Sequence, residues 1–472
     1  MIINHLLCMI FNYKKLNTMK KNILLLIGMI TISFLSAQNQ EKIKLMANWD
    51  DESMPDANYG GTPFSYAGCY GYAAAGREYA IIGSSANIHF IDITDPSNPL
   101  EVDRFPGGDV TVWREMTTYG HYCYAVSDAT DEGLMIFDLS GLPDNVTKVG
   151  QTSQFFTSSH TLFCDEPNGR LYFMGSSGGN VVILDVATNP EAPVLLAANQ
   201  LEGGYIHDMF VKDNIGYANH GWEGLYIYDF TNAAIPDLLA SIPTNGYCHS
   251  SFITEDGQYL AVADEVPTGL PLLMVDVENA ATGDIEIAES FRFPLLTDPG
   301  ETVTYHNPHI KGNYLYVSSY MDGLQVFDIT DPLNPSHFAW YDTFENTEYD
   351  GYNGCWGAYP FLPSGNLLAS DIQNGLFVLQ YDTTSVGVNT ILEDEGMSLY
   401  PNPADNFLKI SLANDNSTIE RIEVLNMAGQ ISSITSSLLN DQFLNIENLT
   451  SGMYLLKVYT REKGYWGKFL KK

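Results

Sequence analysis

The chain has 472 residues and a net charge of −35, with 57 Asp and Glu against 22 Lys and Arg. Residues 38–381 hold 46 acidic and 10 basic side chains, whereas residues 397–472 hold 7 and 8. So acidic a region repels phosphate backbones, which argues against a nucleic-acid partner. The whole chain is 45% apolar, which is enough for one large core and a second, small one.

Two segments come before the part that we expect to fold. Residues 1–18 are charged and mixed, and we interpret them as an upstream extension from a mis-assigned start. From Met19 the chain reads MKKNILLLIGMITISFLSAQ, with two lysines, a short apolar run and a small-residue end. This pattern is typical of a secretory signal peptide over residues 19–37. The run is too short to span a membrane and no second long run follows, so we expect no transmembrane segment in the mature protein.

Residues 38–381 repeat one phrase seven times, as in NIHFIDITDPSNP and GLQVFDITDPLNP. An alternating apolar run is closed by an aspartate in six copies, and Gln380 stands in the seventh. The aspartates are Asp92, Asp138, Asp185, Asp229, Asp276 and Asp328, so the period is 44 to 52 residues. A period of this size indicates stacked supersecondary units. Because the aspartate recurs, we expect it to cap turns rather than to catalyse a reaction.

Four strand signals occur in each of the first six repeats, which is the pattern of a propeller blade. The seventh copy lacks its fourth strand, whereas KIKLMANW at residues 42–49 is a spare strand ahead of the first complete blade. We therefore predict an all-β, seven-bladed β-propeller over residues 38–381. The N-terminal strand should complete the seventh blade, close the ring and remove two free edges.

The innermost strand of each blade begins at a large aromatic residue or a histidine. These positions are Tyr70, Trp113, His160, His207, His249, His306 and Trp356. We expect only the end residues of such strands to reach the channel mouth. The four histidines there could bind zinc or a similar metal, pack between blades, or contact a ligand without a metal. The predicted ligand-binding residues at the mouth are Tyr70, Trp113, Asp208 and Trp356.

Several carboxylates fall near the same end of the blades, namely Glu115, Asp208, Asp264, Glu265 and Glu301. Two acids facing a cavity could form a glycosidase pair or bind calcium. Asp264 and Glu265 follow a strand, where a solvated or turn-capping role is favoured. The chain has no GxSxG, HExxH or phosphate-binding glycine loop, so hydrolases of the common nucleophilic types are unsupported.

Five cysteines remain after export: Cys69, Cys123, Cys164, Cys248 and Cys355. The odd number leaves at least one thiol free. Cys69 and Cys355 lie in blades that meet when the ring closes, so they could form a disulfide there. Buried free thiols are the alternative.

The remaining chain is polar and aperiodic over residues 382–396, which we interpret as a linker. Short alternating runs over residues 397–472 predict a small β-sandwich. With its YPNP, LNMAGQ and LTSGMYLLKV stretches and basic KFLKK end, this region resembles the type A C-terminal sorting domain of type IX secretion. The resemblance implies export across the outer membrane through that machinery. It also implies removal of the domain as the cargo is attached to surface lipopolysaccharide or released.

The propeller region resembles LVIVD-repeat proteins and the choice-of-anchor B family. The matching stretches include VWREMTTYGHYCYAVSD, SSHTLFCDEPNGRLYFMGS and YHNPHIKGNYLYVSSYMDGLQVFDITDP. The resemblance implies a propeller fold at the cell surface and supplies no established chemistry or cofactor. We therefore interpret the chain as a secreted or surface-anchored binding module of unknown ligand. The alternatives are a metal-dependent enzyme acting on polysaccharide or another polymer, and a structural surface-layer component.

Overall fold

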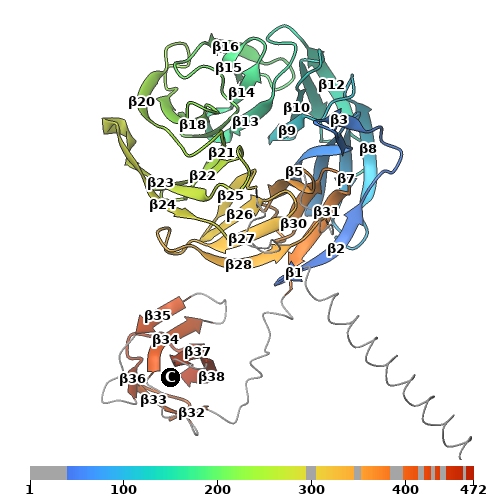
Figure 1. Ribbon diagram of the computed structural model, residues 1–472. Helices are drawn as coiled ribbons and strands as arrows, with labels where there is room; N and C mark the ends of the chain where they lie inside the picture. Colours follow the sequence, from blue (N-terminus) through green and yellow to red (C-terminus); the bar gives the residue numbers. More distant parts are fainter. Residues whose placement is uncertain are drawn as a thin grey trace, which may run out of the picture. The chain divides into compact units, whose positions relative to one another are not determined.

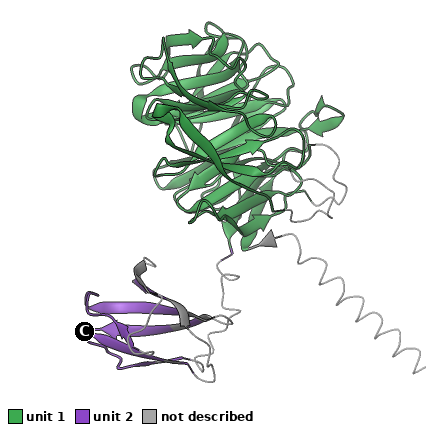
Figure 2. Ribbon diagram, turned by 60° about the vertical axis from the view of Figure 1, so that its left-hand side comes forward, with its two compact units in different colours: residues 1–381 green, residues 382–472 purple. Residues whose placement is uncertain are grey.

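The computed structural model describes residues 40–293, 304–344, 352–382, 397–412, 419–426, 431–435, 443–460 and 464–472. The predicted upstream extension and signal peptide, linker residues 383–396 and Glu301 lie outside the described residues. Two compact units meet in sequence between Tyr381 and Asp382 (Figure 2). The described residues form strands and two 3-10 turns, Glu166–Asn168 and Ala280–Thr282, without an α-helix.

The first unit is a ring of seven antiparallel sheets (Figure 1). Blade 1 contains β5 (Tyr66–Ala74), β6 (Arg77–Ser84), β7 (Asn87–Asp92) and β8 (Leu100–Pro106). Blade 2 contains β9 (Arg114–Tyr119), β10 (Tyr122–Ser127), β11 (Leu134–Asp138) and β12 (Thr147–Thr152). Blade 3 contains β13 (Thr161–Asp165), β14 (Arg170–Ser176), β15 (Gly179–Asp185) and β16 (Val194–Asn199). Blade 4 contains β17 (Asp208–Lys212), β18 (Ile215–Asn219), β19 (Leu225–Asp229) and β20 (Asp237–Ile242).

The remaining three blades complete the circle. Blade 5 contains β21 (Cys248–Ile253), β22 (Tyr259–Asp264), β23 (Leu272–Asn279) and β24 (Asp284–Phe291). Blade 6 contains β25 (Pro308–Lys311), β26 (Tyr314–Ser318), β27 (Leu324–Asp328) and β28 (Ser336–Tyr341). Blade 7 contains β29 (Cys355–Tyr359), β30 (Leu367–Asp371), β31 (Gly375–Tyr381) and the N-terminal β2 (Ile43–Trp49). Each inner strand contacts the next around the ring, and β29 contacts β5. The predicted all-β propeller of seven blades is confirmed.

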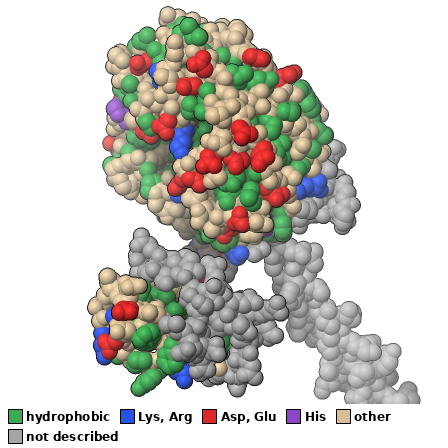
Figure 3. Space-filling view, turned by 90° about the vertical axis from the view of Figure 1, so that its left-hand side faces the viewer, with side chains coloured by type: hydrophobic (Ala, Val, Ile, Leu, Met, Phe, Trp, Pro, Cys, Tyr) green, Lys and Arg blue, Asp and Glu red, His purple; other side chains and the backbone are tan. Residues whose placement is uncertain are grey.

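The hydrophobic core lies between the blades, with one cluster of buried residues at each of the seven interfaces. Between blades 4 and 5, for example, Phe210 and Ile227 pack against Leu260 and Val262. Both faces of a blade are covered by its neighbours, so the middle strands are buried almost along their whole length, as in β6. Acidic side chains are spread over the outer face shown in Figure 3, with few basic ones among them.

A β-bulge recurs in the pairing of the third and fourth strands of every blade. It lies between the two residues that precede the repeated aspartate, or Gln380 in blade 7, and the extra residue is on the outer strand. In blade 2 the bulge separates Ile136 from Phe137. In blade 7 the corresponding extra residue is Met46 of β2. The N-terminal strand thus reproduces the geometry of a regular fourth strand.

The N-terminal segment also contacts a second blade. β2 pairs with β31 from Ile43↔Tyr381 to Trp49↔Leu376, as predicted. Just before it, β1 (Gln40–Glu41) pairs with β28 and gives blade 6 a fifth strand, which the sequence did not indicate. The chain turns from one blade to the next at Lys42, whose φ is 57°. Its Nζ donates a hydrogen bond of 2.9 Å to Phe338 O.

A small hairpin precedes blade 1 and was not predicted. It consists of β3 (Ala57–Tyr59) and β4 (Thr62–Phe64). The turn between them has positive φ at Gly60 and Gly61, 62° and 95°, a conformation that suits glycine. Phe64 and Ala57 are buried against Trp356 and Ile372, which seats the hairpin beside the channel.

The second unit is described by itself. One of its sheets contains β32 (Met397–Tyr400), β33 (Phe407–Leu412) and β36 (Phe443–Asn445). The other contains β34 (Ile419–Asn426), β35 (Ile431–Thr435), β37 (Gly452–Thr460) and β38 (Gly464–Lys471). Leu408 and Ile410 of the first sheet share a core with Val424, Leu456 and Phe469 of the second. This is the predicted small β-sandwich.

Candidate functional site

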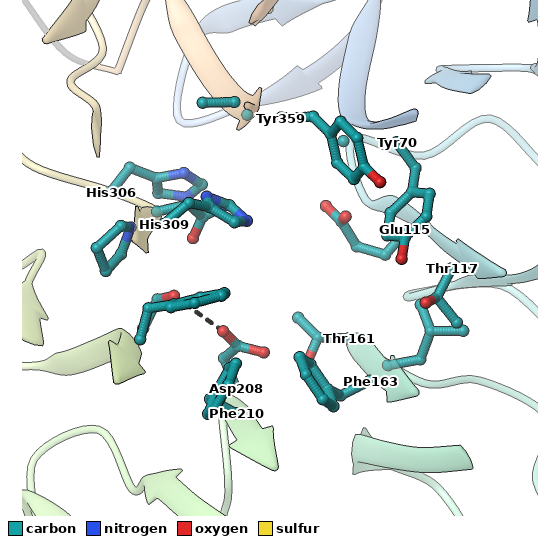
Figure 4. Close-up of a pocket in the computed structure, with 18 of the residues that line it drawn as sticks. Tyr70, Glu115, Thr117, Thr161, Phe163, Asp208, Phe210, His306, His309 and Tyr359 are labelled. Carbon is teal, nitrogen blue, oxygen red and sulfur yellow. Dashed lines mark hydrogen bonds between the residues drawn. The ribbon is translucent and has the colours of Figure 1, made fainter. Parts of the chain in front are cut away.

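The inner strands line the central channel with alternate residues. Thr161 and Phe163 of β13 face it, as do Asp208 and Phe210 of β17 (Figure 4). Side chains along the inner strands, and not only those at the strand ends, therefore line the channel below its mouth. Residues i and i+2 of a strand lie on the same face, and here that face is turned towards the channel.

These residues enclose an inner chamber, a cavity of about 310 Å³. One layer of its wall is mainly aromatic and consists of Tyr70, Thr117, Phe163, Phe210, Phe252, His309 and Tyr359. The next layer, two residues earlier in each strand, is small or polar and consists of Gly68, Glu115, Thr161, Asp208, Ser250, Asn307 and Gly357. A Cβ at Gly68 would lie 2.1 Å from Glu115 Oε2, so a larger residue there would displace the Glu115 carboxyl group.

Two carboxyl groups point into the inner chamber from blades 2 and 4 (Figure 4). Glu115 Oε1 accepts a hydrogen bond of 3.2 Å from Trp356 Nε1. Asp208 Oδ2 accepts one of 2.9 Å from Ser250 Oγ. Burial raises the pKa of Glu115 to about 8 and raises the pKa of Asp208 above its usual value. Glu115 is thus largely protonated at neutral pH and can donate as well as accept a hydrogen bond.

Above this layer, six rings form an arc across blades 2 to 7. Its members, in order, are Trp113, His160, His207, His249, His306 and Trp356. The centroids of successive rings are 5.8, 4.4, 4.1, 4.2 and 4.5 Å apart. The sequence placed these residues at equivalent positions, and the structure brings them together as this histidine arc.

Hydrogen bonds to neighbouring blades orient three of the imidazoles. His207 Nδ1 lies 3.1 Å from His249 O, and His306 Nδ1 lies 2.6 Å from Trp356 O. A carbonyl can only accept, so Nδ1 carries the proton in both rings. His160 Nδ1 lies 2.9 Å from Asp128 Oδ2. Burial lowers the pKa of His306 to about 3 and holds those of His207 and His249 well below the usual 6.5. The rings of His207, His249 and His306 are therefore neutral at physiological pH.

On the other side of the histidine arc is a second cavity of about 450 Å³, which we call the vestibule. The loops that precede the inner strands and the turns between second and third strands form its wall. Its aromatic members are Tyr59, Phe64, Trp113, Tyr205, Trp222, Tyr247, Tyr320, Tyr352 and Trp356. Trp222, Tyr59 and Tyr205 are 65%, 54% and 46% exposed. Large aromatic side chains are thus presented to solvent around a concave site.

The predicted ligand-binding residues fall into two groups. Trp113 and Trp356 line both cavities, at the boundary between them. Tyr70 and Asp208 line the inner chamber and lie deeper than the sequence suggested. Tyr70 is displaced because β5 begins four residues before it and has an irregular register between Tyr66 and Cys69.

The exposed aromatic residues of the vestibule were missed because they lie outside the repeated strands, Tyr59 in the hairpin before blade 1 and Tyr205 and Trp222 in loops. A signal was present in the sequence, since Tyr59 and Trp222 each stand beside a glycine turn, in NYGGT and NHGWEG. Glu265 was expected to be solvated or to cap a turn. It instead lines the vestibule, where its Oε1 accepts a 2.6 Å hydrogen bond from Tyr320 Oη. Asp264 does cap a loop, accepting from the N–H groups of Asn245 and Gly246.

The repeated aspartates have the predicted structural role. Each accepts a hydrogen bond from a backbone N–H two or three residues further on, as Asp229 does from Thr231 at 2.7 Å. The five described cysteines are free thiols, and Cys123, Cys248 and Cys355 are buried. Burial raises the pKa of Cys69 to about 12, so this thiol is not reactive as an anion.

Comparisons with family models match two parts of the chain. The LVIVD repeat matches residues 75–106 and 308–343, within blades 1 and 6. The secretion system C-terminal sorting domain matches residues 398–472. The fold and this tail define a propeller protein that is secreted to the cell surface or the extracellular space. The chain carries LVIVD repeats and is exported by the type IX machinery, with which its sorting domain interacts.

No curated protein matches the chain. Among solved structures, a protein from Lactobacillus plantarum is 13% identical, with a TM-score of 0.47, over 80% of this chain and 98% of its own. Sqt1 of Chaetomium thermophilum, bound to the N-terminus of ribosomal protein L10, is 11% identical, with a TM-score of 0.49, over 67% and 97%. The computationally designed protein Ika8 is 10% identical, with a TM-score of 0.43, over 68% and 87%.

No helix within the described residues has the length and apolar character that crossing a membrane requires.

Proposed function

We propose that this protein is a binding module of the cell surface that holds a neutral carbohydrate chain in the vestibule of its propeller. The observation that carries the proposal is the exposure of Trp222, Tyr59 and Tyr205 around a concave cavity. The cavity volume of about 450 Å³ falls within the range of small-molecule sites. Exposed aromatic side chains gathered in this way mark an interaction site.

The charges of the vestibule favour an uncharged ligand. Among the described residues that line it, none is Lys or Arg, so an anionic ligand would find no countercharge. Its two carboxylates already have partners, Asp128 with His160 and Glu265 with Tyr320. A cationic ligand would have to share these carboxylates with the residues that already contact them.

The shape of the aromatic side chains favours a sugar. Tyr and Trp each combine a flat apolar face with one polar hydrogen-bonding group. A sugar ring likewise has an apolar C–H face and hydroxyl groups at its edge. The ring contacts Trp222–Tyr247 and Tyr59–Trp113, with centroids 5.4 and 5.2 Å apart, hold these faces in fixed orientations. Such pre-ordering reduces the entropy lost on binding.

The proposal is tested by titrating the full chain with neutral oligosaccharides and with anionic counterparts of equal length, using tryptophan fluorescence. We expect saturable binding of a neutral oligosaccharide. Trp222→Ala should weaken this binding about tenfold, which corresponds to a loss of about 1.4 kcal/mol of binding free energy. Tyr400→Ala, an equally drastic change at an exposed tyrosine of the sorting domain, should have no effect. Binding of only the anionic oligosaccharides, or full affinity in Trp222→Ala, would reject the proposal.

A further inference from the structure

Two histidines and one glutamate converge where the histidine arc meets the vestibule. His249, Glu265 and His306 each offer one ligand atom, and these three atoms lie within 4.8 Å of one another. His249 Nε2 is 3.8 Å from Glu265 Oε2, beyond hydrogen-bond distance. The three residues come from different segments of blades 5 and 6, so the fold, not a local motif, assembles them.

In two of these residues, the polar atom that does not face the site already has a hydrogen-bond partner. His306 donates Nδ1–H to Trp356 O at 2.6 Å, which leaves the lone pair of Nε2 free to coordinate. Glu265 Oε1 accepts from Tyr320 Oη at 2.6 Å, which leaves Oε2 facing His249. In metal sites the ligating histidine commonly donates its other N–H to a carbonyl, and the ligating carboxylate is itself hydrogen-bonded. Both features are present here.

The third residue is held in place by packing. His249 is only 4% exposed, and its ring is fixed between those of His207 and His306, at centroid distances of 4.1 and 4.2 Å. The nitrogen that it directs at Glu265 is Nε2. The two neighbouring rings therefore fix the position from which this nitrogen can coordinate.

We propose that His249, His306 and Glu265 bind a divalent transition metal ion, zinc or a neighbour in the first row, with at least one coordination position open to the vestibule. Two imidazoles and one carboxylate are a ligand set for zinc, whereas calcium and magnesium require oxygen ligands. Glu265 lines the vestibule, so a molecule held there could complete the coordination shell. This site does not depend on the proposed carbohydrate binding, and it would supply the metal that a metal-dependent enzyme needs.

The test uses the full chain, stripped with a chelator and titrated with ZnCl₂ or CoCl₂. We expect one equivalent to bind, visible absorption from bound cobalt, and a higher melting temperature with zinc that the chelator reverses. Glu265→Gln keeps the shape of the side chain and its bond to Tyr320, and should weaken binding at least tenfold. His249→Ala and His306→Ala should abolish stoichiometric binding. Tyr320→Phe, which removes only the group that orients Glu265, should weaken it by ten- to a hundred-fold.

His121→Ala is the matched control, because His121 also faces a carboxylate at 3.8 Å, that of Asp138, but on an exposed surface. It should leave metal binding unchanged. Circular dichroism checks that each variant is folded. If the folded chain binds no zinc or cobalt stoichiometrically, or if Glu265→Gln and His249→Ala bind as tightly as the unaltered chain, the proposal is wrong.

Discussion

Arg114 is fully buried and joins blade 1 to blade 2. Its guanidinium donates to the carbonyls of Ser84 and Ser85 in blade 1, and to those of Gly107 and Asp109 in the connecting loop. It also donates to Ser127 Oγ of blade 2. The planar fork of donors satisfies five acceptors at once, which no other side chain can do.

We predict that Arg114→Met lowers the free energy of unfolding by at least about 3 kcal/mol, because it leaves several buried acceptors without a donor. Arg104→Met removes a guanidinium of the same size that is 44% exposed and paired with Asp51. It should cost less than about 1 kcal/mol. Urea unfolding of both variants measures the difference, and similar losses would show that Arg114 does not have this bridging role.

Glu115 should make stability depend on pH. Its pKa is about 8 in the folded protein, because of burial, and near 4.5 in the unfolded chain. A raised pKa means that the protonated carboxyl favours the fold below pH 4.5, and that this contribution is lost as the pH rises through 8. Glu115→Gln is neutral throughout and can still accept from Trp356. We predict that its melting temperature exceeds that of the unaltered chain at pH 8.5 and that the two agree near pH 4.5. A less stable variant at pH 8.5 would contradict the assignment.

At this scale the sequence allowed some roles to be predicted and not others. The aspartate that ends each repeat could be assigned to a turn, because the role is local and recurs six times. Which residues face the channel could not be predicted, because a shift of one residue turns a side chain from one face of a strand to the other. Glu265 was named among the candidate carboxylates but expected to be solvated or to cap a turn, because its partners His306 and Tyr320 lie in blade 6, far away in the sequence.

The elements of the propeller show where a repeat pattern is informative. Blade number and the pairing of β2 with β31 followed from one missing and one spare strand. The bulge before each aspartate and the pairing of β1 with β28 had no sequence signature. Both are features of how an outer strand pairs with the strand beside it. The hairpin of β3 and β4 lies outside the repeat, so its glycine turn was the one sequence signal that indicated it.

We predict that the N-terminal strand is required for a stable ring. Ile43 is completely buried and packs with Ala339, Ala369 and Leu379 between blades 6 and 7. Ile43→Ala should therefore cost about 2–4 kcal/mol. Leu45 of the same strand is 40% exposed, and Leu45→Ala should cost less than about 1 kcal/mol. Thermal unfolding of both variants tests the contrast.

Deleting residues 38–49 should have a larger effect, because it exposes the edges of β31 and β28 together. We expect a much lower melting temperature and aggregation, measured by light scattering. An unchanged melting temperature would show that the ring does not need this strand.

At the scale of the whole molecule, the charge distribution separates the two units. The propeller region is strongly acidic, whereas residues 397–472 are nearly balanced. We predict that a chain truncated after residue 396 folds its propeller but stays in the periplasm, because it lacks the sorting domain. Protease protection of the propeller and surface labelling of intact cells measure the two properties. Surface labelling of the truncated chain at the normal level would refute the export assignment.

The location of the ligand is the central claim, and hydroxyl-radical footprinting of the full chain, with and without its tightest neutral oligosaccharide, tests it most directly. The account predicts protection of Trp222, Tyr59 and Tyr205 in the vestibule, and unchanged oxidation of Leu195 and Leu196 on the exposed outer strand of blade 3. Protection of that outer strand, with the three vestibule residues oxidised as fast as in the free protein, would contradict it.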